Sequence, residues 1–174
     1  MRRFVPLLLA GILLLTLQTT WLSFFPTQRI RPDFLLIFTL YLAFLFPPFF
    51  GGILAFFMGY LMDLFSGNTL GFYTFSRTLV FFATQFLKER FYLEGYSFQF
   101  LFAFIFNILE GGLLLVLING IEPVSFGNLY LSLFTFLLPQ SFCTGLAAPL
   151  LFFLFKKAAS LIFRQPEQGI KARG

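Results

Sequence analysis

Long runs of apolar residues, separated by short polar or proline-containing breaks, dominate the chain. A helix needs roughly 20 apolar residues to cross the hydrocarbon core of a bilayer. The runs predict six spans, at about residues 4–25, 34–46, 49–65, 71–87, 97–119 and 129–155. We therefore expect an all-α integral membrane protein with one polytopic membrane domain over residues 1–163. The polar tail over residues 164–174 is expected to be disordered.

The second predicted span is shorter than a bilayer requires. It runs only from Phe34 to Phe46 and stops at Pro47-Pro48, where a helix cannot continue. A helix of this length rises only about 20 Å. Three interpretations remain open: the helix extends back through Pro32, the bilayer thins locally, or the segment is re-entrant and packs on protein.

Basic residues predict how the chain is oriented. With six crossings, nine Lys and Arg residues fall on the side of the termini, and only Arg29 and Arg31 fall on the other side. This asymmetry predicts that both termini are cytoplasmic. The first apolar run follows Arg2-Arg3 and has no small-x-small cleavage site, so we expect an uncleaved signal anchor. Because the basic residues flank apolar spans, the net charge of +5 does not indicate nucleic-acid binding.

The composition excludes several kinds of chemistry. The chain has no histidine and a single cysteine, Cys143, and only 11% of its residues are charged. Zinc and haem sites lose their usual ligands, and Ser–His and Cys–His catalysis is excluded. Neither standard spacing of a Gly-rich phosphate loop occurs. We expect no metal, no cofactor and no catalytic site, and therefore no enzyme.

Small residues follow one ridge of the third predicted span. Gly51, Ala55, Gly59 and Asp63 are spaced four apart, which places them on one face of a helix. Small residues let another helix approach closely in lipid. The ridge is interpreted either as packing within the chain or as an interface for another protein.

Two charged residues, Asp63 and Arg77, lie in or beside predicted spans that are adjacent and antiparallel. A charge inside a membrane is expensive and is usually paired, so we expect these two side chains to form a salt bridge near the outer face. Two alternatives remain open: Asp63 reaches water at its helix end, or the pair belongs to a proton or ion site.

Polar side chains form stripes on the fourth and fifth predicted spans. The fifth span carries Gln99, Ala103, Asn107 and Gly111 with Glu110 beside them, and the fourth carries Thr74, Arg77, Thr78, Thr84 and Gln85. Such stripes face protein or a water-filled cavity and not lipid. Packing them together would make an intramembrane polar network of Asp63, Arg77, Gln99, Asn107 and Glu110, with Glu110 as a second candidate partner for Arg77. The alternative is a small-molecule pocket.

One part of the chain resembles the rod shape-determining protein MreD family. The second span opens with Pro32-Asp33-Phe34-Leu35-Leu36, and the third begins Gly51-Gly52-Ile53-Leu54-Ala55 and continues through Gly59. It ends in Asp63-Leu64-Phe65-Ser66-Gly67, with Gly71-Phe72-Tyr73 after a short loop. The motif residues of the resemblance are Pro32, Asp33, Asp63, Ser66, Gly67 and Gly71. The match covers about residues 32–80, and the second half of the chain is similar in hydropathy alone.

This resemblance implies a multi-pass protein of the bacterial inner membrane that belongs to the cell-elongation complex. Such a protein binds the bitopic partner MreC and helps to couple the MreB filament to peptidoglycan synthases. It also implies a fold similar to the substrate-binding subunits of energy-coupling-factor transporters. The sequence therefore favours a non-enzymatic scaffold. The alternatives are a small-molecule-binding subunit of a vitamin-type transporter, and a proton-coupled enzyme or transporter that uses Asp63, Arg77 and Glu110.

Overall fold

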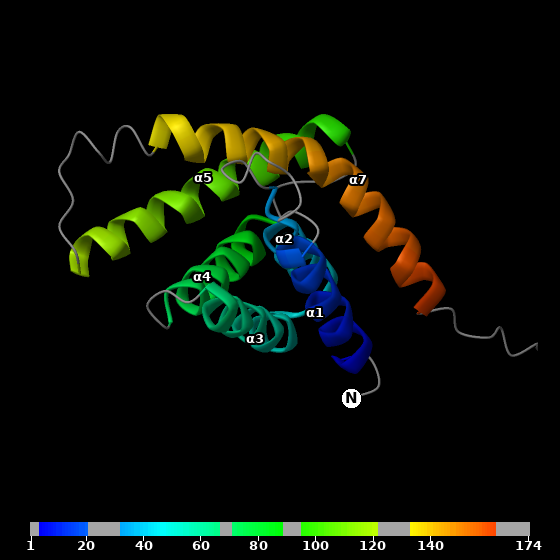
Figure 1. Ribbon diagram of the computed structural model, residues 1–174. Helices are drawn as coiled ribbons and strands as arrows, with labels where there is room; N and C mark the ends of the chain where they lie inside the picture. The colour runs from blue at the N-terminus through cyan, green and yellow to red at the C-terminus, as the bar shows by residue number, and fades with distance from the viewer. Residues whose placement is uncertain (1–3, 21–31, 67–70, 89–94, 122–132, 163–174) are drawn as a thin grey trace, which may run out of the picture.

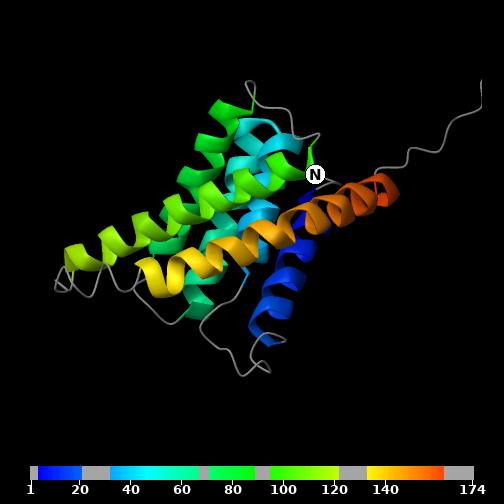
Figure 2. The same ribbon diagram turned by 90° about the horizontal axis from the view of Figure 1, so that it is seen from above.

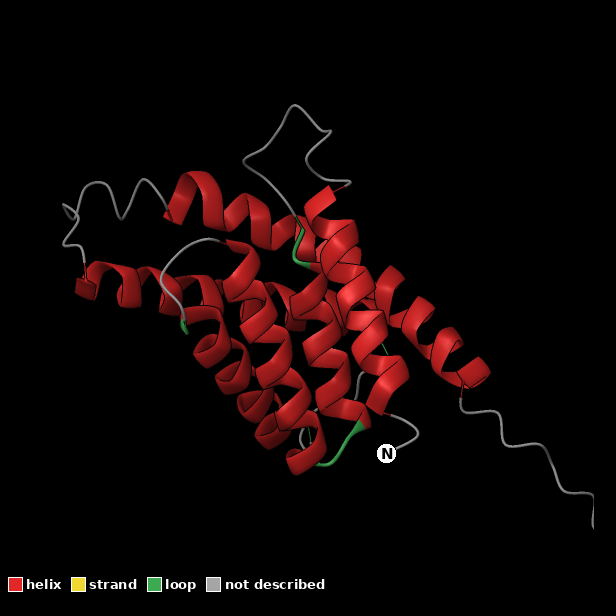
Figure 3. Ribbon diagram, turned by 60° about the horizontal axis from the view of Figure 1, so that its bottom comes forward, coloured by secondary structure: helices red, strands yellow, loops and turns green. Residues whose placement is uncertain are grey.

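The computed structural model describes residues 4–20, 32–66, 71–88, 95–121 and 133–162. These residues form helices throughout and contain no strand (Figure 3). The helices are α1 (Phe4–Thr20), α2 (Phe34–Leu45), α3 (Pro48–Ser66), α4 (Phe72–Leu87), α5 (Tyr96–Ile121) and α7 (Leu138–Ile162). A π-helical turn, η2 (Leu133–Leu137), leads directly into α7. The prediction of an all-α fold with six helices is confirmed.

The helices are arranged as a cluster crossed by a pair. Helices α1 to α4 lie side by side, and α5 and α7 pack on each other and run obliquely across the cluster (Figures 1 and 2). Helix α5 also packs on α4, and α7 also packs on α2. Three helical segments, Pro48–Ser66, Tyr96–Gly120 and Thr135–Ala158, are long and apolar enough to cross a membrane.

Helix α2 occupies the centre of the fold. It contacts each of the other five helices, and eight of its 12 residues are buried. Leu35, Leu36 and Leu40 have no exposed surface. A helix surrounded by protein in this way is apolar on all sides. Its short length is therefore accommodated inside the protein, where it does not face lipid along its full circumference.

Both ends of α2 are fixed by polar contacts. The Asp33 side chain accepts a hydrogen bond from the Leu36 backbone N–H at 2.9 Å, so α2 begins at Phe34 and the proposed extension back through Pro32 is wrong. At the other end, Pro48 opens α3, where a missing N–H costs nothing. The Gln85 side chain donates hydrogen bonds to the carbonyls of Ala43 and Phe46 at 2.8 and 2.7 Å.

Helices α3 and α4 form a close antiparallel hairpin. A Cβ atom added at Gly59 would lie only 2.6 Å from the Thr74 Cα and 2.7 Å from the Tyr73 carbonyl oxygen. Only glycine permits this backbone approach. Gly71 caps α4 with a φ of 104°, a conformation that favours glycine. The last residues of the first predicted span, the first residues of the sixth and the tail over 164–174 lie outside the described residues.

Candidate functional site

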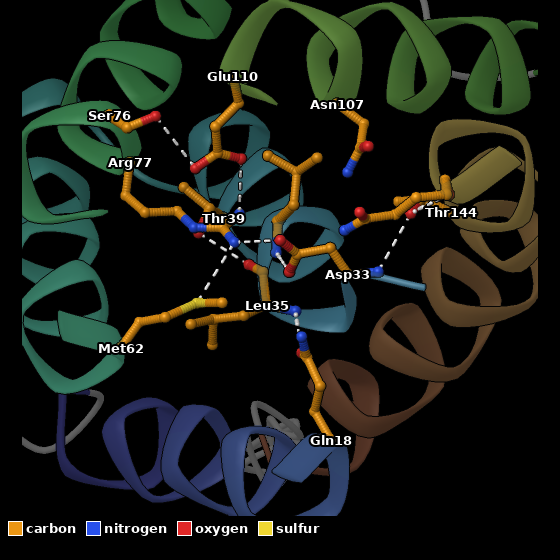
Figure 4. A network of polar contacts seen from close by, with 12 residues as sticks. Gln18, Asp33, Leu35, Thr39, Met62, Ser76, Arg77, Asn107, Glu110 and Thr144 are labelled. Carbon is orange, nitrogen blue, oxygen red and sulfur yellow. Dashed lines mark hydrogen bonds and ion pairs between the residues drawn. The ribbon is translucent and has the colours of Figure 1, made fainter. Parts of the chain in front are cut away.

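Arg77 on α4 is the centre of a buried charge network. Its side chain has no exposed surface. The guanidinium forms ion pairs with Asp33, at the start of α2, and with Glu110 on α5 (Figure 4). The distance from Arg77 Nη1 to Glu110 Oε2 is 3.1 Å. One side chain thus connects three helices through charge-assisted contacts.

Asp33 has several partners in addition to Arg77. One carboxylate oxygen accepts the Leu36 N–H, and the other accepts from the guanidinium. The Asp33 backbone N–H donates to the Thr144 hydroxyl on α7 at 3.1 Å. This residue therefore caps α2, pairs with α4 and fixes α7 at the same time.

Glu110 completes the network from α5 and is 3% exposed. Its Oε1 accepts a hydrogen bond from the Ser76 hydroxyl at 3.2 Å. The network therefore contains two carboxyl groups and one guanidinium. Arg77 Nη2 also contacts the Met62 sulfur at 3.5 Å. Among the described residues, Arg77 Nε and Nη1 have no hydrogen-bond partner, although Nη1 pairs with Glu110 by charge.

Asp63 lies outside this network, so the expected Asp63–Arg77 salt bridge is wrong. Its carboxylate accepts the backbone N–H groups of Tyr73 and Thr74, each at 2.9 Å, and the Thr74 hydroxyl. These N–H groups belong to the first turn of α4, which has no donor-satisfying residue at its own N-cap because that position is Gly71. Asp63 is a cap supplied by the neighbouring helix, and its negative charge suits the N-terminal end of α4. Arg77 instead makes the alternative pairing with Glu110.

The remaining residues of the expected polar network lie apart from Arg77. Asn107 pairs with the Ser141 hydroxyl at 2.8 Å, which joins α5 to α7. Gln99 lies about three turns before Glu110 on α5, outside the group that contacts Arg77. The hydroxyls of Thr78 and Thr84 donate to carbonyls of their own helix.

The residues of the small ridge are all buried within the chain. Gly51 faces the Phe81 ring, Ala55 has no exposed surface, Gly59 lies against the backbone of α4, and Asp63 caps it. Helix α4 therefore occupies this ridge.

The residues of the family motif lie at the ends of helices. Pro32 precedes the Asp33 cap, Ser66 ends α3, and Gly71 caps α4. Gly67 lies outside the described residues.

A cavity of about 580 Å³ lies next to the charge network. Its polar wall consists of Gln18, Asp33, Ser66, Tyr73, Asn107, Glu110 and Gln140. Its apolar wall comes mainly from α5 and η2, which diverge here from α1 and α3, and includes Leu114, Leu115, Ile118, Phe136 and Leu137. The volume falls within the range of small-molecule sites.

Sequence reasoning missed several members of the site, including Ser76, Gln18 and Gln140. Asp33 stood out as a motif residue but not as the partner of Arg77, which lies 44 positions away. Thr144 was not recognised at all. The available signal for Asp33 was a carboxylate immediately before a fully apolar helix, where a cap or a buried ion pair is needed. Within the described chain, no three His, Cys, Asp or Glu side chains are grouped as a metal site would require.

Comparison with known proteins gives one informative result. Residues 1–161 match the family described as rod shape-determining protein MreD. No curated protein and no solved structure matches the chain. The match extends well beyond the motif region around Asp33 and Asp63 and includes every helix of the charge network. The chain therefore belongs to the MreD family of rod shape-determining proteins.

Proposed function

We propose that this protein is a non-enzymatic scaffold of the rod complex in the bacterial inner membrane. It would bind an MreC-like bitopic partner and help to couple an MreB-like filament to peptidoglycan synthases. The observation that carries the proposal is the family match over residues 1–161, because the family acts in the system that determines rod shape. The protein would lie in the lipid bilayer. We expect no nucleic-acid partner.

The contacts of the charged side chains support a structural role. Asp63 is used in capping α4, and Asp33 and Glu110 are paired with Arg77. These groups connect helices to each other, as expected of a protein whose task is to hold a shape that a partner recognises. A proton-coupled enzyme or transporter using Asp63, Arg77 and Glu110 together loses its basis, because Asp63 does not join the other two.

The orientation follows from the charge asymmetry. With six crossings and cytoplasmic termini, the ends of α1 and α3 and the starts of α2 and α4 lie on the outer side. Residues from all four of these ends line the cavity: Gln18, Ser66, Asp33 and Tyr73. The cavity and the charge network would therefore lie in the outer half of the bilayer.

Copurification from the native host tests the proposal. The protein carries a tag after Gly174 and is extracted in mild detergent, with an unrelated tagged membrane protein as control. Recovery of a single-span partner together with cell-wall synthesis proteins is the expected result. A monomeric protein with no partner would contradict the scaffold.

A second candidate function is favoured by the cavity of about 580 Å³. A small-molecule-binding subunit of a vitamin-type transporter also needs such a cavity between helices. The same experiment separates the two functions. Copurification of an ATPase module without cell-wall proteins would replace the scaffold by the transporter subunit.

The partner interface can be mapped with exposed apolar positions. Ile53 on α3 and Leu146 on α7 lie on the surface of the chain, at 36% and 60% exposure. Ile53→Trp and Leu146→Trp add bulk that lipid accommodates but a close helix interface does not. If one variant loses the partner at unchanged abundance, its helix contributes to the interface.

A further inference from the structure

The cavity beside Arg77 has an unbalanced set of charges. Asp33 and Glu110 both line it, whereas Arg77 lies behind them and is fully buried. When both carboxyl groups are ionised, they and the one guanidinium carry a net charge of −1. No Lys or Arg is among the described residues that line this cavity. A second buried carboxylate is costly without a cation of its own, so a bound cation would stabilise the ionised form of this pair.

Both carboxylates also retain the capacity to accept further hydrogen bonds. Each carboxylate oxygen can accept about two donors. The two oxygens of Asp33 each receive one donor, from Leu36 and from Arg77. For Glu110, Oε1 receives the Ser76 hydroxyl, and Oε2 forms an ion pair with Arg77 without a hydrogen bond. A ligand that carries several N–H donors would use the remaining acceptor positions.

Asn107 gives an independent indication of a ligand. It is 4% exposed, and one end of its amide contacts the Ser141 hydroxyl. The other end, which points toward the middle of the site in Figure 4, has no hydrogen-bond partner among the described residues. Gln18 resembles it, because its Oε1 accepts the Leu35 N–H at 3.3 Å and its other amide atom has no such partner. Both amide ends line the cavity, so a ligand there could pair with them.

We propose that the cavity binds a small organic cation, a primary ammonium group attached to an apolar body. The ammonium lies between Asp33 and Glu110, and an adjacent hydroxyl or carbonyl pairs with the free amide end of Asn107. The apolar body lies against Leu114, Leu115 and Leu137. A phosphate or carboxylate ligand is disfavoured by the two carboxylates, and a single metal ion would leave most of the volume unfilled.

Two sources supply this chemistry: a free amine in solution and the head group of an ethanolamine phospholipid. Reconstitution in nanodiscs of choline and glycerol phospholipids removes all primary ammonium groups from the lipid. Parallel nanodiscs containing ethanolamine phospholipid restore them. Stabilisation by this lipid without any added amine would assign the site to the head group.

The probe is n-octylammonium, and n-octanol is the uncharged control of equal chain length. Thermal unfolding of the full-length protein in the lipid without primary amines is followed as each is titrated. We expect n-octylammonium to raise the midpoint by several degrees and to bind at least tenfold more tightly than n-octanol. Equal effects of the two compounds would overturn the proposal, because they would reflect partition of the alkyl chain alone.

Three variants locate the effect. Glu110→Gln keeps an acceptor for Ser76 and leaves Arg77 paired with Asp33, so the protein should fold while the preference for the cation disappears. Leu115→Trp fills the cavity and should abolish binding of both probes. Val116→Trp is the matched control, because Val116 is 71% exposed and does not line the cavity. A response to n-octylammonium that survives Leu115→Trp, or one lost equally in Val116→Trp, would place the effect elsewhere and refute the site.

Inorganic cations provide the last check. Sodium chloride at the same ionic strength replaces n-octylammonium in the titration, with potassium chloride as reference. No difference between the salts is expected. Stabilisation by sodium that matches the effect of n-octylammonium would show that the carboxylates hold a metal cation and would overturn the organic-cation proposal.

Discussion

Two regions of the molecule accommodate a buried carboxylate in different ways. One is the α3–α4 interface, and the other is the region between α5 and helices α1 to α4. In both, a carboxylate lies inside a largely apolar protein. At the α3–α4 interface, Asp63 receives two backbone N–H groups and a hydroxyl, and Gly59 brings the two backbones together. Near α5, Asp33 and Glu110 share one guanidinium beside a cavity. Both regions hold helices together, but the second also leaves polar groups and space available to another molecule.

Replacing Arg77, the cation shared by Asp33 and Glu110, should have the largest effect on stability. Arg77→Met leaves two carboxyl groups buried without their partner, which typically costs about 3–5 kcal/mol. We expect a large fall in thermal stability and in abundance in the membrane. Because the triple change Arg77→Met, Asp33→Asn and Glu110→Gln removes the charges together, it should recover most of that loss. A single Arg77→Met variant as stable as the parent would contradict the description of the network.

Adding a side chain at Gly59 should have the next largest effect on stability. Gly59→Ala places a Cβ 2.6 Å from the α4 backbone, which has no flexible side chain to move aside. We expect a loss of about 1–3 kcal/mol, measured by thermal or chemical unfolding in detergent. The matched control is Gly112→Ala, because a Cβ at Gly112 meets nothing within 4 Å. That change should be neutral or slightly stabilising, since alanine favours helix. Equal effects at the two positions would show that the α3–α4 approach is looser than described.

Weakening the cap on α4 should cost somewhat less. Asp63→Asn keeps the size of the side chain but removes the charge and one acceptor for the first turn of α4. We expect a loss of about 1–2 kcal/mol in unfolding experiments. Thr78→Val is the control, because that hydroxyl only contacts its own helix. If Asp63→Asn were as mild as the control, the capping role would be refuted.

Filling the cavity should have the smallest effect on stability. Leu115→Trp adds volume where about 580 Å³ is free, so we expect a change within about 1 kcal/mol. The same change at Leu54, which is 3% exposed in the core, should be strongly destabilising. Unfolding of the two variants in the same detergent checks this contrast. Equal sensitivity would mean that the cavity is as tightly packed as the core.

The α3–α4 interface was easier to predict from sequence than the charge network. Both partners of its hairpin are adjacent in the chain, so the four-residue spacing from Gly51 to Asp63 directly indicated a close-packed face. The apolar runs also indicated the helices, because lipid leaves few alternatives to a hydrogen-bonded helix. What Asp63 contacts was not predictable, since backbone N–H groups do not appear in a sequence pattern.

The charge network depended on contacts between distant segments. Asp33 and Arg77 meet because α2 lies in the centre of the fold. The spacing of apolar residues does not indicate which helix is central. Glu110 was named as a candidate partner only because its helix face carried other polar residues. The cavity arises from the divergence of α5 and η2 from α1 and α3, which helix-by-helix patterns do not show.

Cysteine labelling in nanodiscs tests the contrast between the two regions most directly. In a Cys143→Ser background, which removes the native thiol, Gln140→Cys places a thiol on the cavity wall and Ala55→Cys places one in the α3–α4 interface. Each variant is treated with a water-soluble maleimide before and after denaturation. We expect rapid labelling of Gln140→Cys in the folded protein and labelling of Ala55→Cys only after denaturation. Equal labelling of the two folded variants, or none at Gln140→Cys, would contradict it.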